Sequence, residues 1–191
     1  SRSICSSSMK FERDQARLAA AVSGSFGTTA ILIDLTNPDA PAVITPGLWN
    51  APGSSDGYAL DGDMFVVRSS SGISAFDVSD PRQPHLLFRV EGFGSVTSVA
   101  AKDGVIAVLS SGQRPWLIDA SAPDRILSTF QDRAFRGSFN ALASGPDGIV
   151  TAMAGLIDTS DQHHPYLREW VAPTPVLGAN KVAGVHGAVV A

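Results

Sequence analysis

The chain has 191 residues, a formal net charge of −4, 17% charged residues and 44% hydrophobic residues. Its length allows one all-β domain with a proper core, and its composition argues against intrinsic disorder. Lysine occurs only at positions 10, 102 and 181, and no apolar run approaches the roughly 18 residues of a membrane span, so the sequence argues against a nucleic-acid partner and against a membrane-spanning segment.

The amino-terminal residues 1–8 are rich in serine and lack the apolar region of a signal peptide. Cys5 is the only cysteine, which excludes an internal disulfide and leaves a free thiol, a bridge to another chain or a lipid attachment as alternatives. A first unit, approximately residues 9–44, is predicted to contain four strands at 9–11, 18–22, 30–35 and 42–44. The alanine-rich second segment is a weak strand former, so a helix is its alternative.

The second unit, approximately residues 45–90, has the clearest pattern. Its β-branched and aromatic residues occupy four runs, and glycine, aspartate and serine occupy the breaks. The predicted strands are 58–60, 64–68, 73–78 and 85–90. Pro81 and Pro84 cannot donate to a ladder and are predicted to lie in the turn before the fourth strand.

The third unit, approximately residues 91–130, repeats this order with predicted strands at 96–101, 105–109, 116–120 and 126–130. The fourth unit, approximately residues 131–170, places a first strand at 139–142 and a second at 149–153. The turn before its third run is almost deleted, which shortens this repeat.

The carboxyl-terminal residues 171–191 contain a partial fifth unit. Residues 182–191 match residues 99–108 position for position, with His186-Gly187 in place of an Asp-Gly pair. Either this segment completes the amino-terminal blade and closes a ring, or the chain is one piece of a longer propeller whose remaining blades are on another chain or are missing. The second explanation is favoured, because the first unit supplies inner strands of its own.

An aspartate at the end of the third strand marks every full unit and recurs every 39 to 43 residues, at Asp34, Asp77, Asp119 and Asp158. A period of roughly 40–45 residues made of short strands and turns is typical of a β-propeller blade. The sequence therefore predicts an all-β fold. The whole chain 1–191 would form a single β-propeller of four-stranded blades, with four full repeats, a partial fifth and the option of a larger propeller.

The fullest copy of the repeat, Ile73 to Pro84, reads apolar-Asp-apolar-Ser-x-Pro-x-x-Pro and resembles the LVIVD repeat of bacterial and archaeal surface and secreted proteins. The resemblance extends from Leu18 to Val176. It implies a propeller located outside the cytoplasm, whether extracellular, periplasmic or at the cell surface, and the low lysine content agrees. It implies no particular activity. The third unit has only Pro123 after its aspartate, and the fourth has two histidines before Pro165.

The aspartate column has a structural interpretation, in which each carboxylate accepts hydrogen bonds from the following backbone as in an Asx turn. A ring of metal ligands is the alternative. The pairs that begin at Asp61, Asp103 and Asp147 are predicted hairpin turns. No cofactor is predicted, although the acidic residues Asp56, Asp61 and Asp63 leave calcium as an alternative without the spacing of an EF-hand.

Histidines occur at positions 85, 163, 164 and 186. The adjacent His163 and His164 fit either a solvated loop or a weak metal site. No Gly-x-Ser-x-Gly elbow and no phosphate-binding loop is present, so no residue pattern identifies a reaction.

Aromatic and arginine side chains outside the strand pattern are the candidate contact residues, since tryptophan and arginine are enriched at interaction hot spots. They are Trp49, Phe93, Arg114, Trp116, Arg133, Phe135, Arg136, Phe139 and Trp170. Packing between blades is preferred for Trp116 and Trp170, and contact with a partner for Trp49, Arg133, Phe135 and Arg136. The predicted function is a non-catalytic scaffold for protein–protein or surface-structure interactions. The alternatives are an extracellular hydrolase or lyase with its pocket at the channel mouth, and a carbohydrate-binding module that uses Trp49.

Overall fold

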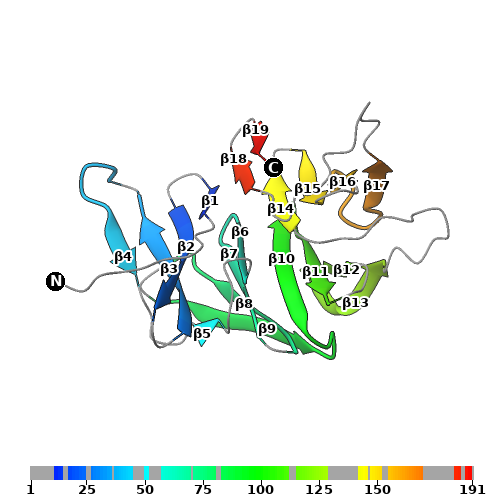
Figure 1. Cartoon of the computed structure of the whole chain (residues 1–191), viewed down its shortest axis with the longest axis horizontal. Coiled ribbons are helices and arrows are strands. Elements are labelled where there is room, and N and C mark those ends of the chain that lie inside the picture. The colour runs from blue at the N-terminus through cyan, green and yellow to red at the C-terminus, as the bar shows by residue number, and fades with distance from the viewer. Residues whose placement is uncertain are drawn as a thin grey trace.

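The computed structural model describes residues 11–14, 17–24, 27–35, 37–44, 50–51, 57–69, 71–80, 83–111, 115–128, 142–145, 147–151, 155–169, 183–185 and 188–190. Every regular element in these ranges is a β-strand, and the strands form five antiparallel sheets (Figure 1). The predicted all-β class is therefore confirmed. None of the described segments forms a helix long and apolar enough to span a bilayer.

Sheet 1 consists of β1 (Phe11–Asp14), β2 (Arg17–Gly24), β3 (Gly27–Asp34), β4 (Ala42–Ile44) and β5 (Asn50–Ala51). The strands pair in the order β1-β2-β3-β4, and β5 also pairs with β3. The alanine-rich segment is the strand β2 and not a helix. It pairs with β3 along its whole length, and this long ladder to a strand rich in isoleucine and leucine overrides the weak strand propensity of alanine.

Sheet 2 consists of β6 (Tyr58–Asp61), β7 (Met64–Arg68), β8 (Gly72–Asp77) and β9 (His85–Glu91). Sheet 3 consists of β10 (Val96–Lys102), β11 (Val105–Ser110), β12 (Trp116–Asp119) and β13 (Ala122–Ser128). The strands predicted for the second and third units are all present, but β13 begins four residues before its predicted start. Since Asp119 pairs directly with Ala122, a two-residue turn replaces the expected proline turn, and Pro123 lies in an irregular part of the strand.

Sheet 4 consists of β14 (Leu142–Gly145), β15 (Gly148–Thr151), β16 (Gly155–Asp158) and β17 (Tyr166–Glu169). Its first strand begins at the last residue of the predicted range 139–142, and residues 139–141 lie outside the described part of the chain. Sheet 5 consists of β18 (Ala183–Val185) and β19 (Ala188–Val190), which pair with each other and not with a described strand of sheet 1.

The core consists of apolar layers between neighbouring sheets. On β12, the fully buried Leu117 belongs to a cluster with residues of sheet 4, and the adjacent, fully buried Ile118 belongs to a cluster with residues of sheet 2. Successive residues of a strand point to opposite faces, so both faces of sheet 3 are covered. This explains why its strands are nearly continuous apolar runs. Each such side chain contributes about 1.5–3 kcal/mol of burial.

The first strands of the sheets lie together in the middle of the molecule (Figure 1). Along the chain, β6 contacts β10, β10 contacts β14, and β14 contacts β18. The amino-terminal strand β1 contacts both β6 and β18. The five first strands are therefore neighbours in chain order, and the first and last of them also meet.

Candidate functional site

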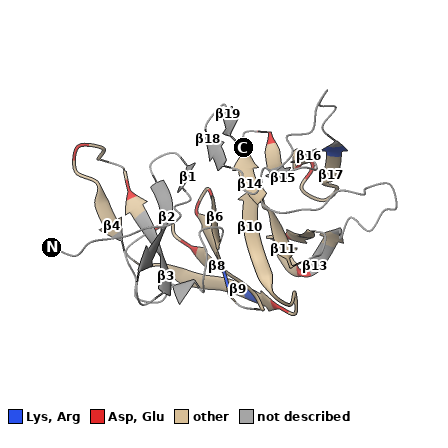
Figure 2. Cartoon of the chain, in the orientation of Figure 1, with Lys and Arg blue, Asp and Glu red and all other residues tan. Residues whose placement is uncertain are grey.

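Three of the four repeated aspartates, Asp77, Asp119 and Asp158, accept a hydrogen bond from the backbone of their own turn. The Oδ1 atom of Asp77 accepts a hydrogen bond from the Ser79 amide at 2.7 Å, and Asp119 and Asp158 accept equivalent bonds from Ser121 and Ser160 at 2.9 Å. This is the Asx-turn pattern that the sequence predicts. Asp34 occupies the equivalent position at the end of β3, where it is half-buried. Figure 2 shows acidic residues at such strand ends.

The turns between first and second strands also link neighbouring sheets. Asp103 and Gly104 have φ values of 52° and 76°, the positive pair that a type I′ hairpin turn requires. The Gly104 amide donates to Oδ2 of Asp61 at 2.9 Å and so connects the end of β6 to sheet 3. Asp61 itself ends its strand, and Gly62 and Asp63 form the two-residue turn. In sheet 4, a side chain at Gly148 would collide with the carbonyl oxygen of Ile157, which explains the glycine.

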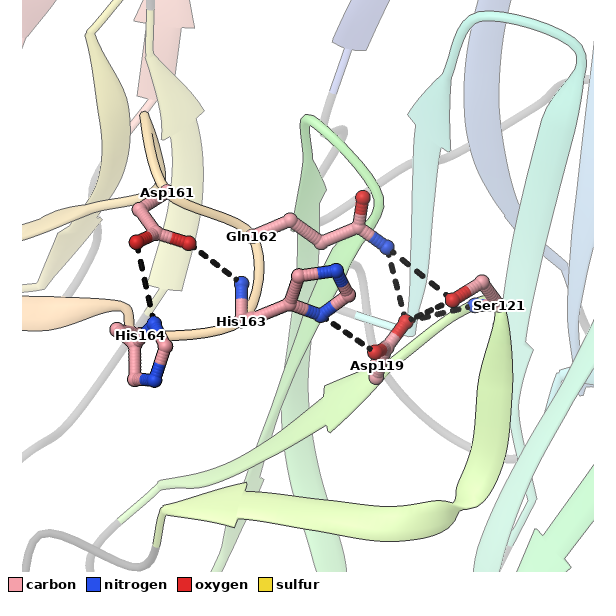
Figure 3. Close-up of polar contacts among 6 residues, drawn as sticks. All are labelled: Asp119, Ser121, Asp161, Gln162, His163 and His164. Atoms are coloured by element: carbon pink, nitrogen blue, oxygen red, sulfur yellow. Dashed lines mark hydrogen bonds and ion pairs between the residues drawn. The ribbon is translucent and has the colours of Figure 1, made fainter.

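A polar cluster around one buried carboxylate lies between sheets 3 and 4 and consists of Asp119, Ser121, Gln162 and His163; we call it the Asp119 cluster (Figure 3). Asp119 is only 1% exposed. Its Oδ1 atom accepts hydrogen bonds from the Ser121 hydroxyl at 2.6 Å and from the Gln162 amide at 2.8 Å. Its Oδ2 atom lies 3.2 Å from Nδ1 of His163, which comes from the loop before β17.

These donors stabilise the charged form of the Asp119 carboxylate. The Ser121 hydroxyl, followed by the Ser121 backbone amide, Gln162 and His163, lowers the pKa of Asp119 from 3.8 to about 2, against the opposing effect of burial. The group is therefore an anion at neutral pH that is fully engaged by protein donors. It joins two sheets and has no strong tendency to take up a proton.

One further contact supports the same junction. The Thr159 hydroxyl donates to Oδ2 of Asp103 at 3.0 Å, which connects the end of β16 to the first turn of sheet 3. Within sheet 4, Asp158 accepts from the Tyr166 hydroxyl at 3.0 Å and pairs with Arg168. Hydrogen bonds from Ser160 are the main reason that the pKa of Asp158 is lowered.

An open hollow of about 400 Å³ lies beside these turns, at one end of sheets 2 and 3. Its lining residues are Asp61, Asp63, Met64, Asp77, Leu87, Gly104, Ala120 and Ser121. The carboxylate of Asp61 binds the Gly104 amide, and Asp77 binds the Ser79 amide and lies 3.5 Å from His85. Within the described ranges, no three acidic, histidine or cysteine side chains are grouped to hold a metal ion, and Asp56 lies outside those ranges.

The preferred contact residues Trp49, Arg133, Phe135 and Arg136 all lie outside the described residues, as do Arg114, Phe139, Trp170 and His186. Phe93 is only 4% exposed and packs against Trp116, with ring centroids 5.7 Å apart and ring planes inclined by 56°. The prediction that Phe93 is a contact residue at the surface is therefore wrong. Packing of Trp116 between two units is confirmed, since it contacts a core cluster shared by sheets 2 and 3.

Sequence reasoning missed Gln162 and His163. The two histidines of this loop were expected to be solvated or to bind metal, and both are exposed, His163 at 56% and His164 at 80% of the side chain, with His164 beside Asp161 at 3.1 Å. His163 also reaches the buried Asp119 of the neighbouring sheet. The repeat period is the signal that could have indicated it, because the two residues lie 44 positions apart, about one unit.

Comparisons with known proteins give a fold and no family. No family model matches the chain, and no curated protein matches it. Among solved structures, the chain is similar to the crystal structure of the computationally designed Ika8 protein, at 12% sequence identity and a TM-score of 0.52. The match covers 95% of this chain and 66% of that one, so this chain spans slightly less than two thirds of the designed protein's length. A likeness at this identity bears on the fold alone.

Proposed function

We propose that the chain is a β-propeller in which sheets 1 to 5 are successive blades, and that it acts as a non-catalytic scaffold for protein–protein or surface-structure interactions. The cyclic contacts among the first strands support the propeller, because β1 contacts both its chain neighbour β6 and the last first strand, β18. The apolar layers between sheets 2, 3 and 4 support it as well, since propeller blades pack face to face.

The main support for the scaffold role is that the repeated aspartate carboxylates accept hydrogen bonds from groups within the protein. Asp77, Asp119 and Asp158 each hold their own turn, and Asp61 holds the next sheet. A catalytic centre instead needs ionisable groups that converge on a space for substrate. Asp77, Asp119 and Asp158 lie about one repeat apart. Asp61 and Asp77 line one hollow, but each accepts a hydrogen bond from a backbone amide, of Gly104 and Ser79 respectively.

The outer strands provide surface for a partner. Large apolar side chains are about half exposed or more on the last strands of sheets 1, 2 and 4, at Val43, Leu86, Leu87 and Tyr166. Leu86 and Leu87 are adjacent and both exposed because a register shift interrupts the pairing of β8 with β9 at this point. The partner in this proposal is another protein or further blades on another chain. The proposed location is outside the cytoplasm, in the extracellular space, the periplasm or at the cell surface, and the low lysine content and the LVIVD resemblance support it.

The test combines native mass by light scattering, a thermal melt, small-angle X-ray scattering and a screen with ester and polysaccharide substrates. We expect a ring-shaped particle, no turnover, and a melting temperature that rises when the chain associates. Turnover by the purified chain would contradict the scaffold role. An extended row of sheets in the scattering profile would contradict the propeller.

One observation favours the hydrolase alternative. A buried carboxylate within 3.2 Å of an imidazole nitrogen, as for Asp119 and His163, is how hydrolases orient a general base. However, the Ser121 hydroxyl donates to Asp119 and not to the imidazole, so the cluster lacks an activated nucleophile. Loss of turnover in His163→Gln with retention in His164→Gln would favour this alternative, and equal rates in the two variants would exclude His163 as a base.

A further inference from the structure

The hollow between sheets 2 and 3 lies where the turn before the fourth strand is short. In sheets 2 and 4, seven residues separate the aspartate that ends the third strand, Asp77 or Asp158, from its partner at the start of the fourth strand. In sheet 3, Asp119 pairs with Ala122, so the turn has two residues. Sheet 3 therefore lacks the longer loop that sheets 2 and 4 have.

In sheet 4, the longer loop contacts the aspartate of the preceding sheet. Gln162 donates to Oδ1 of Asp119 at 2.8 Å, and Nδ1 of His163 lies 3.2 Å from Oδ2. The two-residue turn of sheet 3 has no counterpart of Gln162 and His163. The hollow lies at this place, since its lining includes Asp77 and both residues of the short turn. It is therefore the counterpart, one repeat earlier, of the space that the Gln162 and His163 side chains occupy.

The first turns of the two sheets can be aligned residue by residue. Val78 donates to the Asp63 carbonyl in sheet 2, as Ala120 donates to the Gly104 carbonyl in sheet 3. Gly104 lies beneath the Gln162 side chain, because a Cβ atom added there would meet the Gln162 amide at 3.0 Å. Sheet 2 therefore has a carboxylate, that of Asp63, where sheet 3 leaves room for a neutral amide.

The hollow is also more acidic than its counterpart at a second position. Asp61 takes the place of Lys102, since each pairs with the residue that begins the second strand. Together with Asp63 and Asp77, this gives three carboxylates in the lining, and the described lining residues include no lysine or arginine. Asp61 accepts from the Gly104 amide, but an ionised carboxylate offers about four acceptor sites. The hollow therefore suits a positively charged donor better than a neutral one.

The size and the apolar surface of the hollow indicate the kind of cation. Its volume is about 400 Å³, and within the described residues no three acidic side chains are grouped to hold a metal ion. Met64 and Leu87 line it as well, and Leu87 is 48% exposed. The aliphatic stem of a long cationic side chain packs on such a surface while its charged end stays beside the carboxylates. An arginine guanidinium also presents several donors in a planar fork.

We propose that the hollow between sheets 2 and 3 binds an arginine side chain of a protein partner, with the guanidinium beside Asp61, Asp63 and Asp77 and the stem on the adjacent apolar surface. This proposal rests on the proposed scaffold role and names the chemistry of its partner. The occupant follows from charge complementarity and from the donors that Gln162 and His163 supply at the equivalent place. The partner's arginine substitutes for the loop that sheet 3 lacks.

The probe is N-acetyl-arginine amide, which carries the arginine side chain between two peptide groups, as in a protein. It is titrated into the isotope-labelled 191-residue chain, and binding is followed by the amide resonances of the lining residues Gly104 and Ser121. We expect saturable shifts at both amides, and about tenfold weaker binding of N-acetyl-citrulline amide, a neutral ligand of nearly the same shape. Equal affinity of the two ligands would overturn the proposal.

A matched pair of variants tests the carboxylates. Asp77→Asn removes a charge from the lining and keeps an Oδ1 acceptor for the Ser79 amide, and it should weaken binding of the capped arginine about threefold or more. Asp124→Asn removes the same charge from an exposed position of sheet 3 outside the lining, and it should leave the affinity unchanged. Equal affinities in the two variants would mean that the hollow is not the site.

A second pair keeps the proposal testable if Asp77→Asn does not fold. Leu87→Arg places a guanidinium of the chain itself in the hollow and should abolish binding of the capped arginine. Leu86→Arg adds the same charge at the preceding residue, which is not among the lining residues, and should retain binding. Both leucines are about half exposed, at 51% for Leu86 and 48% for Leu87, so both variants are compatible with the fold. An equal loss in the two would contradict the proposed place of the arginine.

The remaining outcomes separate the sources of the ligand and the two proposals. Free arginine that binds about tenfold or more tighter than the capped form would identify a small-molecule site and overturn the protein partner. No shift at Gly104 and Ser121, with no turnover and a ring-shaped scattering profile, would refute the arginine site and leave the scaffold proposal intact. Turnover of ester or polysaccharide substrates would contradict the scaffold role, on which this proposal rests.

Discussion

The junction between sheets 2 and 3 and the junction between sheets 3 and 4 come from the same repeat but are held together differently. The first is chiefly apolar, with the tilted Phe93–Trp116 pair in its layer. Its side-chain links run from Asp61 to the Gly104 amide and from Arg68 to the Val96 carbonyl. The second has a smaller apolar cluster and a denser set of polar links, namely Asp119 with Gln162 and His163, Asp103 with Thr159, Ser98 with Leu142 and Ser144 with Ala101.

This difference shows that units with the same backbone structure can be joined to their neighbours by different side-chain contacts. The strand register and the Asx turns are shared by both junctions, so they define the sheets. What joins one sheet to the next depends on residues that vary between units. The apolar junction should be insensitive to pH, and the polar junction should weaken in acid.

The largest expected loss of stability comes from truncating a buried side chain on either face of β12. Leu117→Ala opens a cavity toward sheet 4 and Ile118→Ala opens one toward sheet 2, and both side chains are fully buried. Each variant should lower the free energy of unfolding by about 2–5 kcal/mol, as measured by urea denaturation. A loss below about 1 kcal/mol at Ile118 would contradict the apolar character of the first junction.

The next effect tests the polar junction. Asp119→Ala removes a buried carboxylate, leaves the partly buried donors of Ser121 and Gln162 without their acceptor and should lower the free energy of unfolding by about 1–3 kcal/mol. The matched variant Asp77→Ala removes a more exposed carboxylate at the equivalent position of sheet 2 and should cost less. Equal losses would mean that the Asx turn, and not the link between sheets, is what Asp119 supplies.

Acid should act on the same junction. The pKa of Asp119 is depressed to about 2 in the folded protein, so its stabilisation is complete above the ordinary value of 3.8 and is lost as the pH falls from 3.8 toward 2. The lowered pKa values of Asp158 and Asp161 act in the same direction. Urea midpoints measured across this range should fall in the wild type and fall less in Asp119→Asn, and parallel curves would contradict the assignment.

The smallest expected change in stability is at His163, the exposed histidine of the Asp119 cluster. His163 is half exposed, so its pair with Asp119 should contribute no more than about 1 kcal/mol, and His163→Gln should lower the free energy of unfolding by that much or less. His164→Gln removes a more exposed pair with Asp161 and serves as the control, with no measurable change expected. A loss at His163 above that of Asp119→Ala would reverse this ranking.

Much of the local structure could be predicted from the sequence. The strands of the second and third units were located from apolar runs bounded by Gly, Asp and Ser, since side-chain type and turn chemistry act over a few residues. The match of residues 182–191 to 99–108 also predicted the strands and register of sheet 5. The start of β13 was missed because a single proline does not define a turn by itself.

The Asp119 cluster could not be derived in the same way. That Asp119 ends a strand and binds its own turn follows from the local sequence, because the donors lie two residues away. That Gln162 and His163 reach Asp119, and that Asp119 is buried, depends on how sheets 3 and 4 pack against each other. Interactions within a strand or turn follow from neighbouring residues, whereas contacts one repeat apart require the distance and angle between sheets, which packing sets.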